Sequence, residues 1–522
     1  MKRWLSFALV FCAFTASRAD YTITLIHTND LHAHVEPVKV KGQELGGYAR
    51  LATLIKNIKQ TSEHPLLVNG GDTFQGTLYF NVYHGLADVA AMNAMGYQGA
   101  AVGNHEFDLG PKALGDFARL ASFPILAANL DVTTDPNLKD VIKPFVIIQL
   151  RDKEEEERMR EEKVDKGKEI EGDEGEKIGI VGCVTPDLPM ISSPGPTVKM
   201  KPLVSSVQAA IDQVLAMEVD KVILLSHCGY AEEQELARKL KGVDIVVGGH
   251  SHTLLGNTVL PGDIKGAGPY PTVVKNADGD TCLVVQSWEW GKVLGKLDVT
   301  FDEQGRIEKW SDDQPIPVTS IVSEDPDIKA MVAAFKKPIE DLMNKEVGET
   351  SNEIPRSGPG KQGPMADMIT DAMLDATKNM GSVVAFMNAG GVRSALNPGK
   401  ITYGDAISVQ PFNNTLVTLE MKGSEIHEAL SSGILFVSAG SSFSLQSNKA
   451  TDIVIAGQPL DPNKTYMCTF NSFVANGGDG LTVVKEAKGK RIDTGLLDID
   501  AFLDYIKAHS PLNLSGAGRI KG

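Results

Sequence analysis

The sequence predicts an α/β protein of two domains joined by a helix. Its 522 residues exceed what one ordinary hydrophobic core accommodates. Between Tyr21 and Val299, short β-branched runs alternate with helical patterns such as 48–58 and 111–120, as in layered α/β sheets. A helical pattern begins after Asp325, and a second mixed segment follows near Val347. Apolar residues make up 42% of the chain and charged residues 23%, which is typical of a soluble globular protein.

The first nineteen residues differ from the rest. Lys2 and Arg3 precede an apolar run over 4–14, and small residues then lead to Ala19, which is the pattern of a secretory signal. This run is too short to span a bilayer, no other segment has the roughly 20 apolar residues that a span needs, and the polar C-terminus has no tail for a lipid anchor. We expect a signal peptide over residues 1–19 and a secreted or periplasmic protein without a membrane span.

The charge balance excludes nucleic-acid polymers as partners. Removal of residues 1–19 takes away three bases and no acid, so the formal net charge falls from −16 to −19. Binding a nucleic-acid polymer needs an excess of Lys and Arg on one face. A small anionic substrate remains compatible if cations gather locally.

Four cysteines remain after the signal peptide. They are far apart, lie in apolar runs and lack the spacing of a metal site; they are Cys183, Cys228, Cys282 and Cys468. Although an exported protein can form disulfides, we expect buried free thiols.

Five apolar runs of the first domain each end in a cluster of polar residues. These clusters contain Asp30, His32, Asp72, Asn104, His105, Asp108, His227, His250 and His252. Each cluster follows its strand, and open α/β sheets bind ligands at the carboxyl edge of their strands. The glycines 70–71, 103 and 248–249 precede these clusters. Glycine permits the close backbone approach or positive φ that a tight cation site demands.

The donor types indicate the metal chemistry. Imidazole, carboxylate and amide donors without thiolate suit Zn²⁺, Mn²⁺, Fe or Co²⁺. Seven candidate ligands exceed what one tetrahedral ion uses; they are Asp30, His32, Asp72, Asn104, His227, His250 and His252. Two ions that share a bridging carboxylate fit better, and such pairs serve phosphate-ester hydrolysis.

The remaining elements follow in chain order. Residues 151–177 hold 13 acids and 8 bases in 27 residues, which indicates a solvated insertion. Asp325 before Pro326 predicts a helix start, and helical spacing continues to Leu342, with a kink expected at Pro338. In the second domain, the residue pattern predicts a helix over 364–377, a strand over 382–388, a strand, turn and helix over 415–430, and a late helix over 498–508.

These motifs carry a family resemblance. The order D-x-H, GGD, GNHE, H and GHSH resembles the calcineurin-like metallophosphoesterase superfamily, and the strings HTNDLHAH, GDTFQGTLYFN, GNHEFDLG and GGHSH resemble its 5′-nucleotidase family. The likeness covers nearly all of 21–506 apart from the insertion. It implies a four-layer α/β/β/α catalytic domain over 20–320, a linker helix over 321–345 and an α+β substrate-binding domain over 346–522.

The resemblance also implies residue roles in the first domain. One divalent ion would be held by Asp30, His32, Asp72 and His252, and the other by Asp72, Asn104, His227 and His250. His105 would face the phosphate and stabilise charge there, and Asp108 would orient its imidazole and keep it cationic.

In the second domain, the resemblance implies Phe412 and Phe473 as a clamp on the base and Asp479 as the ribose contact. Asn388, Arg393 and Arg356 would make further polar contacts. Because metals and base belong to different domains, the resemblance implies an active site at their interface and a hinge near the Asp325 helix.

The predicted function is that of an exported 5′-nucleotidase with two metal ions, which releases phosphate and a nucleoside from nucleoside monophosphates. Di- and triphosphates or nucleotide sugars are further candidate substrates. A 2′,3′-cyclic nucleotide phosphodiesterase with 3′-nucleotidase activity stays open as an alternative. A thiosulfohydrolase is disfavoured because a small sulfonate needs no aromatic clamp. A non-catalytic nucleotide-binding protein should have lost a ligand position, and none is missing.

Overall fold

The structure is a computed structural model that describes residues 20–151, 175–262, 264–357, 361–412, 414–447, 449–514 and 518–521. The expected signal peptide and most of the charged insertion, 152–174, lie outside the described residues. The chain divides into two compact units, 1–335 and 336–522. The division falls within helix α9 (Pro326–Met343), and each unit is described by itself.

Two sheets form the centre of the first unit. The first has the strand order β17 (Ile307–Trp310), β16 (Val293–Phe301), β1 (Tyr21–Thr28), β4 (Pro65–Asn69), β5 (Gly99–Ala101), β6 (Ile125–Leu126) and β8 (Ile142–Lys143), with β18 (Ile316–Pro317) beside β16. The second has the order β14 (Thr272–Lys275), β15 (Thr281–Val285), β13 (Ile245–Val247), β12 (Lys221–His227), β10 (Glu176–Val184) and β9 (Phe145–Leu150). Strands β1, β4, β5, β6 and β8 run parallel, as do β10, β12, β13 and β15.

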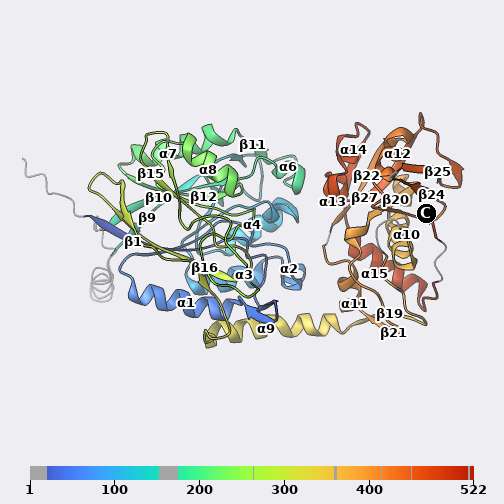
Figure 1. The fold of residues 1–522 in the computed structure, drawn as a ribbon, viewed down its shortest axis with the longest axis horizontal. Coiled ribbons are helices and arrows are strands. Elements are labelled where there is room, and N and C mark those ends of the chain that lie inside the picture. Colours follow the sequence, from blue (N-terminus) through green and yellow to red (C-terminus); the bar gives the residue numbers. More distant parts are fainter. Residues whose placement is uncertain are drawn as a thin grey trace, which may run out of the picture. The chain divides into compact units, whose positions relative to one another are not determined.

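Side chains that point alternately to the two faces of each sheet produce the layered packing. In β12, Ile223 and Leu225 share a buried cluster with Leu25 of the first sheet, whereas Val222 and Leu224 share another with helix residues. Successive strand side chains point to opposite faces, so one face packs on the other sheet and one on α7 (Leu203–Ala216) and α8 (Tyr230–Lys239). Helices α1 (Tyr48–Thr61), α3 (Leu86–Met95) and α4 (Gly110–Leu120) lie on the opposite side (Figure 1). The four-layer α/β/β/α arrangement is thereby confirmed.

Shorter elements complete the first unit: α2 (Leu78–Tyr83), α6 (Leu188–Ile191), and the pairs β2 (Val38–Val40) with β3 (Gln43–Leu45) and β7 (Leu130–Asp131) with β11 (Lys199–Met200). Helix α9 begins where the sequence predicts, because the Asp325 carboxylate accepts from the backbone N–H groups of Asp327 (3.0 Å) and Ile328 (3.2 Å). Pro338 lies inside this helix.

The second unit is α+β, as expected. Its larger sheet has the order β23 (Leu435–Val437), β20 (Val384–Asn388), β27 (Thr465–Asn471), β22 (Thr415–Lys422) and β28 (Arg491–Leu497), and a smaller one has β26 (Gln458–Pro459), β25 (Lys449–Ile455), β24 (Ser442–Gln446) and β29 (Ile520–Lys521). Strands β19 (Glu346–Thr350) and β21 (Gly399–Thr402) pair separately. The helices are α10 (Pro364–Thr377), α11 (Tyr403–Val409), α12 (Gly423–Ser431), α13 (Ser472–Ala475), α14 (Thr482–Glu486) and α15 (Asp498–His509).

All four described cysteines are buried and free, which confirms the expectation of unpaired thiols. The Sγ atoms of Cys183 and Cys228 are 3.9 Å apart. Within the described ranges, every helix is too short or too polar to cross a membrane.

Candidate functional site

The candidate ligands of the first unit follow five strands. Asp30 and His32 follow β1, Asp72 follows β4, Asn104 follows β5, His227 ends β12, and His250 and His252 follow β13. Asp30, His32, Asp72, Asn104 and His227 are buried, and the other two are half-buried. The carboxyl ends of these strands therefore bring polar side chains into an interior position.

Asp72 is central to this cluster. Its Oδ2 lies 2.9 Å from Nε2 of His227 and 3.8 Å from Nε2 of His32. Donor atoms of Asp72, His227 and His250 lie within 4.8 Å of one another, as do those of His32, Asp72 and His105. One carboxylate is therefore shared by imidazoles from both sheets.

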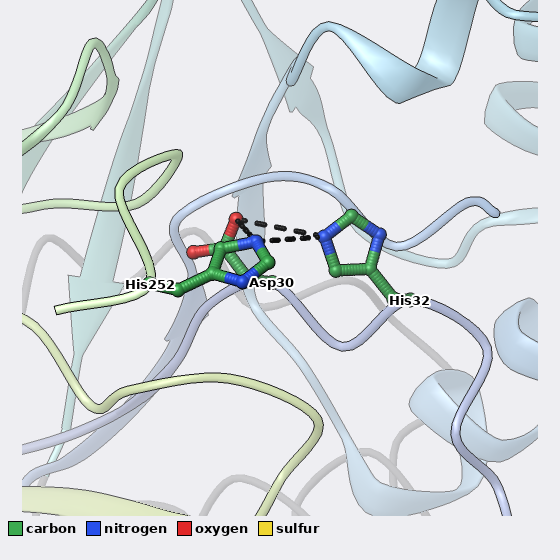
Figure 2. Close-up of side chains that lie close together, drawn as sticks. All are labelled: Asp30, His32 and His252. Atoms are coloured by element: carbon green, nitrogen blue, oxygen red, sulfur yellow. Dashed lines mark hydrogen bonds and ion pairs between the residues drawn. The ribbon is translucent and has the colours of Figure 1, made fainter. Parts of the chain in front are cut away.

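Asp30 lies beside a second pair of imidazoles. Its Oδ1 is 3.9 Å from Nε2 of His32 and 3.3 Å from Nε2 of His252 (Figure 2). The backbone N–H of His250 donates to the same carboxylate at 3.1 Å, and Nδ1 of His250 lies 2.8 Å from Oδ1 of Asn104. The structure thus brings all seven candidate ligands together.

Hydrogen bonds orient the imidazoles. Nδ1 of His32 lies 2.9 Å from the carbonyl oxygen of Phe74, and Nδ1 of His227 lies 2.7 Å from that of Gly70. Because a carbonyl oxygen only accepts, each Nδ1 carries a proton and each Nε2 is directed toward the carboxylates. Nε2 of His32 lies 3.0 Å from Nε2 of His252. Imidazole nitrogens that converge on two buried carboxylates form a donor set that fits divalent cations such as Zn²⁺, Mn²⁺ or Co²⁺.

The electrostatics of the cluster agree with this fit. Burial opposes a charge on His227, but Asp72 and Asp30 raise its pKa to about 10. Burial likewise opposes a charge on His252, and Asp30 and Glu289 raise its pKa to about 10. The buried carboxylates therefore favour positive charge at His227 and His252, which either a proton or a metal ion supplies, whereas burial lowers the pKa of His32 and His250.

The backbone is held in an uncommon conformation at the ligands. Five of them have left-handed φ values: Asp30 (51°), His32 (47°), Asp72 (52°), His250 (71°) and His252 (49°). Such residues cost on the order of 1–3 kcal/mol each and gather at functional sites. Close approach also explains one of the glycines, because a Cβ on Gly103 would lie 2.2 Å from Oδ1 of Asp72.

His105 and Asp108 form a pair beside the cluster. His105 opens the short 3₁₀ helix η1 (His105–Phe107), and its Nδ1 lies 2.6 Å from Oδ2 of Asp108. Burial lowers the pKa of His105, but Asp108 and Asp72 raise it to about 9. Asp108 also accepts from Nε2 of Gln75 (3.0 Å) and Oγ of Ser192 (2.8 Å). The carboxylate is thus fixed, and it fixes the imidazole.

A buried carboxylate joins two of the ligand loops. Glu106 accepts from the backbone N–H groups of Gly103 (2.6 Å), Thr73 (2.7 Å), Asp72 (3.1 Å) and Phe74 (3.1 Å). The loop after β4 is thereby tied to the loop after β5. The GNHE string marks this residue, but it does not reveal the partners.

Glu233 of α8 likewise joins two ligand loops, which here follow strands of the second sheet. It accepts from the N–H groups of Gly229 (3.1 Å) and Gly249 (3.0 Å) and from Nε2 of Gln286 (2.6 Å). The loop of His227 is thus tied to the loop of His250. Sequence reasoning missed Glu233, because one acid in a polar helix carries no signal.

The second unit holds the other predicted site residues. Asn388 ends β20, and its Nδ2 donates to Oδ2 of Asp479 at 2.7 Å. The guanidinium carbon of Arg393 lies 5.7 Å from the ring centre of Phe412. Nε of Arg356 donates to the carbonyl of Val392 at 2.9 Å, next to Arg393.

The two aromatic residues of the predicted clamp are unusually open. Phe412 is 48% exposed and Phe473 is 47% exposed. A Cβ on Gly478 would lie 2.4 Å from the Phe473 ring, so the glycine turn packs closely on that ring. Large rings at this exposure are available to stack on a ligand.

Comparison with known proteins assigns both units. The family model of calcineurin-like phosphoesterases matches residues 23–254, and that of the 5′-nucleotidase C-terminal domain matches residues 346–486. A snake venom 5′-nucleotidase from Gloydius brevicauda is 33% identical over 98% of this chain and 91% of its own length.

Solved structures agree with this assignment. The 5′-nucleotidase precursor from Thermus thermophilus is 39% identical with a TM-score of 0.70, covering 96% of this chain and 99% of that one. NAD nucleotidase from Haemophilus influenzae is 25% identical with a TM-score of 0.65, covering 97% and 99%. The likeness identifies a phosphoric monoester hydrolase for nucleotides that uses divalent metal ions, which sets aside a non-catalytic binding protein. The chain belongs to the 5′-nucleotidase family of calcineurin-like phosphoesterases.

Proposed function

We propose that this protein is an exported 5′-nucleotidase that uses two metal ions to convert nucleoside 5′-monophosphates to nucleoside and phosphate. The observation that carries the proposal is the position of Asp72, whose Oδ2 lies near imidazoles from both predicted ligand sets, His32 at 3.8 Å and His227 at 2.9 Å. A single shared carboxylate is the arrangement by which two ions are held close together.

The ligand assignment is the one that the family resemblance implies, and these contacts support it. Asp30, His32, Asp72 and His252 would hold one ion, and Asp72, Asn104, His227 and His250 the other. When bound, such ions supply Lewis acidity and a nucleophile at neutral pH.

His105 and Asp108 complete the chemistry of the first unit. The Asp108 carboxylate accepts a hydrogen bond from Nδ1 of His105 at 2.6 Å, so the proton stays on Nδ1. Nε2 is then the nitrogen that donates a hydrogen bond to a phosphate oxygen or to the leaving oxygen, where negative charge develops.

Residues of the second unit would determine substrate specificity. The exposed rings of Phe412 and Phe473 would stack on the base. Asp479, held by Asn388 at 2.7 Å, would accept from ribose hydroxyls. Arg393 and Arg356 would offset phosphate charge.

The test is hydrolysis of four compounds, 5′-AMP, 3′-AMP, 2′,3′-cyclic AMP and UDP-glucose, with Mn²⁺, Zn²⁺ or Co²⁺ added. Release of inorganic phosphate measures cleavage of the two monophosphates, and chromatography of the products measures opening of the cyclic compound to a monophosphate and cleavage of UDP-glucose to UMP and glucose 1-phosphate. We expect 5′-AMP to be hydrolysed most efficiently. Preference for the cyclic or 3′ compound would replace the proposal with the phosphodiesterase alternative. A metal-loaded protein that binds AMP and leaves it intact would overturn the enzymatic mechanism. Export is tested by the mass of the mature protein, which should lack residues 1–19.

A further inference from the structure

A turn outside the predicted ligand set is fastened to the Asp30 loop. The turn consists of Trp288, Glu289 and Trp290, and both tryptophans have left-handed φ values of 65° and 60°. Nδ2 of Asn29 donates to the carbonyl of Trp288 at 2.6 Å, and the N–H of Trp290 donates to the carbonyl of Asp30 at 2.6 Å. The turn is thus bound on both sides to the loop that carries a candidate ligand.

The Glu289 carboxylate connects this turn to His252. One oxygen accepts a hydrogen bond from Nδ1 of His252, and the other accepts from Nζ of Lys292 at 2.5 Å. Since both oxygens have partners, Glu289 acts on its neighbour rather than as a further ligand.

Lys292 is itself enclosed. The residue is 2% exposed, and its Nζ lies 3.4 Å from the ring centre of Trp288 and 4.4 Å from that of Trp290. Two aromatic faces stabilise the cation and limit the directions in which it can move. The ammonium group therefore holds the Glu289 carboxylate in one position.

His252 needs such support more than His32 and His227 do. Backbone carbonyls hold Nδ1 of His32 and of His227, whereas a side chain holds Nδ1 of His252. Its side chain is also 33% exposed, against 7% for His32 and 0% for His227. Unlike those of His32 and His227, the orientation of His252 therefore depends on a side chain that a substitution can remove.

We propose that Glu289 is a positioning residue that directs Nε2 of His252 toward Asp30 and His32, and that Lys292, held between Trp288 and Trp290, fixes Glu289. This inference rests on the proposed two-ion function. An acceptor behind a metal-bound imidazole sets its tautomer and ring orientation, and its loss costs about 10–100-fold in metal affinity.

The experiment is calorimetric titration of the metal-free full-length protein with Co²⁺, for the wild type and the variants Glu289→Ala, Glu289→Gln and Lys292→Met. We expect Glu289→Ala to weaken one of two ion sites by about 10–100-fold and to leave the other within about twofold. Glu289→Gln should restore most of the affinity, because its amide oxygen still accepts from Nδ1 of His252. Lys292→Met should lie between the wild type and Glu289→Ala.

A matched control is Lys296→Met in β16. Lys296 pairs with Asp298 (2.8 Å) and Asp313 (2.6 Å), neither of which is a candidate ligand, so both ions should bind as in the wild type. Circular dichroism verifies folding, and if Glu289→Ala fails to fold, Glu289→Gln and Lys292→Met still decide the matter.

Four outcomes would count against these ideas, and they are distinguishable. Wild-type affinity for both ions in Glu289→Ala, or an equal loss at both sites in a folded variant, would overturn the positioning role alone. A Glu289→Gln variant as weak as Glu289→Ala would also overturn it. A wild type that binds fewer than two ions would overturn the proposed two-ion function.

Discussion

Replacement of Glu106 by Gln tests whether this buried carboxylate holds two ligand loops together. Oε1 accepts from the N–H groups of Thr73 and Phe74, and Oε2 accepts from those of Asp72 and Gly103. A glutamine keeps one oxygen and replaces the other by an NH₂ group, so two of the four N–H groups lose their acceptor. A buried donor without an acceptor costs about 1–3 kcal/mol. We therefore expect the free energy of unfolding to fall by about 2–6 kcal/mol.

The assay is unfolding in urea, monitored by tryptophan fluorescence. The four tryptophans are at positions 4, 288, 290 and 310, so the signal reports the first unit. Burial and Asp72 raise the pKa of Glu106 to about 7, and measurement at pH 8 therefore compares glutamine with the ionised carboxylate.

The control for this experiment is Glu235→Gln in α8. Glu235 pairs with Arg238 at 2.6 Å, and the two side chains are 54% and 46% exposed. Loss of an exposed ion pair costs about 0–1 kcal/mol. If Glu106→Gln destabilised the protein no more than this control does, the reasoning about backbone acceptors would be wrong.

Three further predictions concern catalysis, substrate choice and pH. His105→Ala should lower kcat for AMP by roughly 100-fold or more while elemental analysis still finds the metal ions; a collapse of the metal content would instead make His105 a ligand. Phe473→Ala should raise KM for AMP far more than KM for a small aryl phosphate, and an equal rise for both would refute stacking on the base. Burial raises the pKa of Asp88, whose carboxylate accepts from Tyr48, to about 7, so the native state binds more protons than the unfolded state between about pH 4 and pH 7. Stability should therefore decline as pH rises through this interval, by about 3 kcal/mol from pH 5 to pH 8, and Asp88→Asn should remove that part of the decline in urea unfolding curves; an unchanged decline would contradict the assignment.

Local signals were sufficient for much of the fold. The helix expected over 364–377 is α10 with the same bounds, because Pro364 suits a first turn and apolar residues recur at helical spacing. The helix expected over 48–58 continues to Thr61, because a polar last turn leaves no apolar repeat to read. Such boundaries depend on residues that are neighbours in the chain.

The sequence by itself determined the alternation of strands with helices in the first domain, the glycines that precede the ligand candidates, and the donor types that suit divalent cations. Only the tertiary structure decided which groups support those donors. Glu106 accepts from Asp72, 34 residues earlier, and Glu289 accepts from His252, 37 residues earlier. Periodicity and composition describe local geometry, whereas the partner of a buried carboxylate depends on which distant loops the packed sheets bring together. Burial then sets the pKa values and the strength of those contacts, and no short stretch of sequence specifies it.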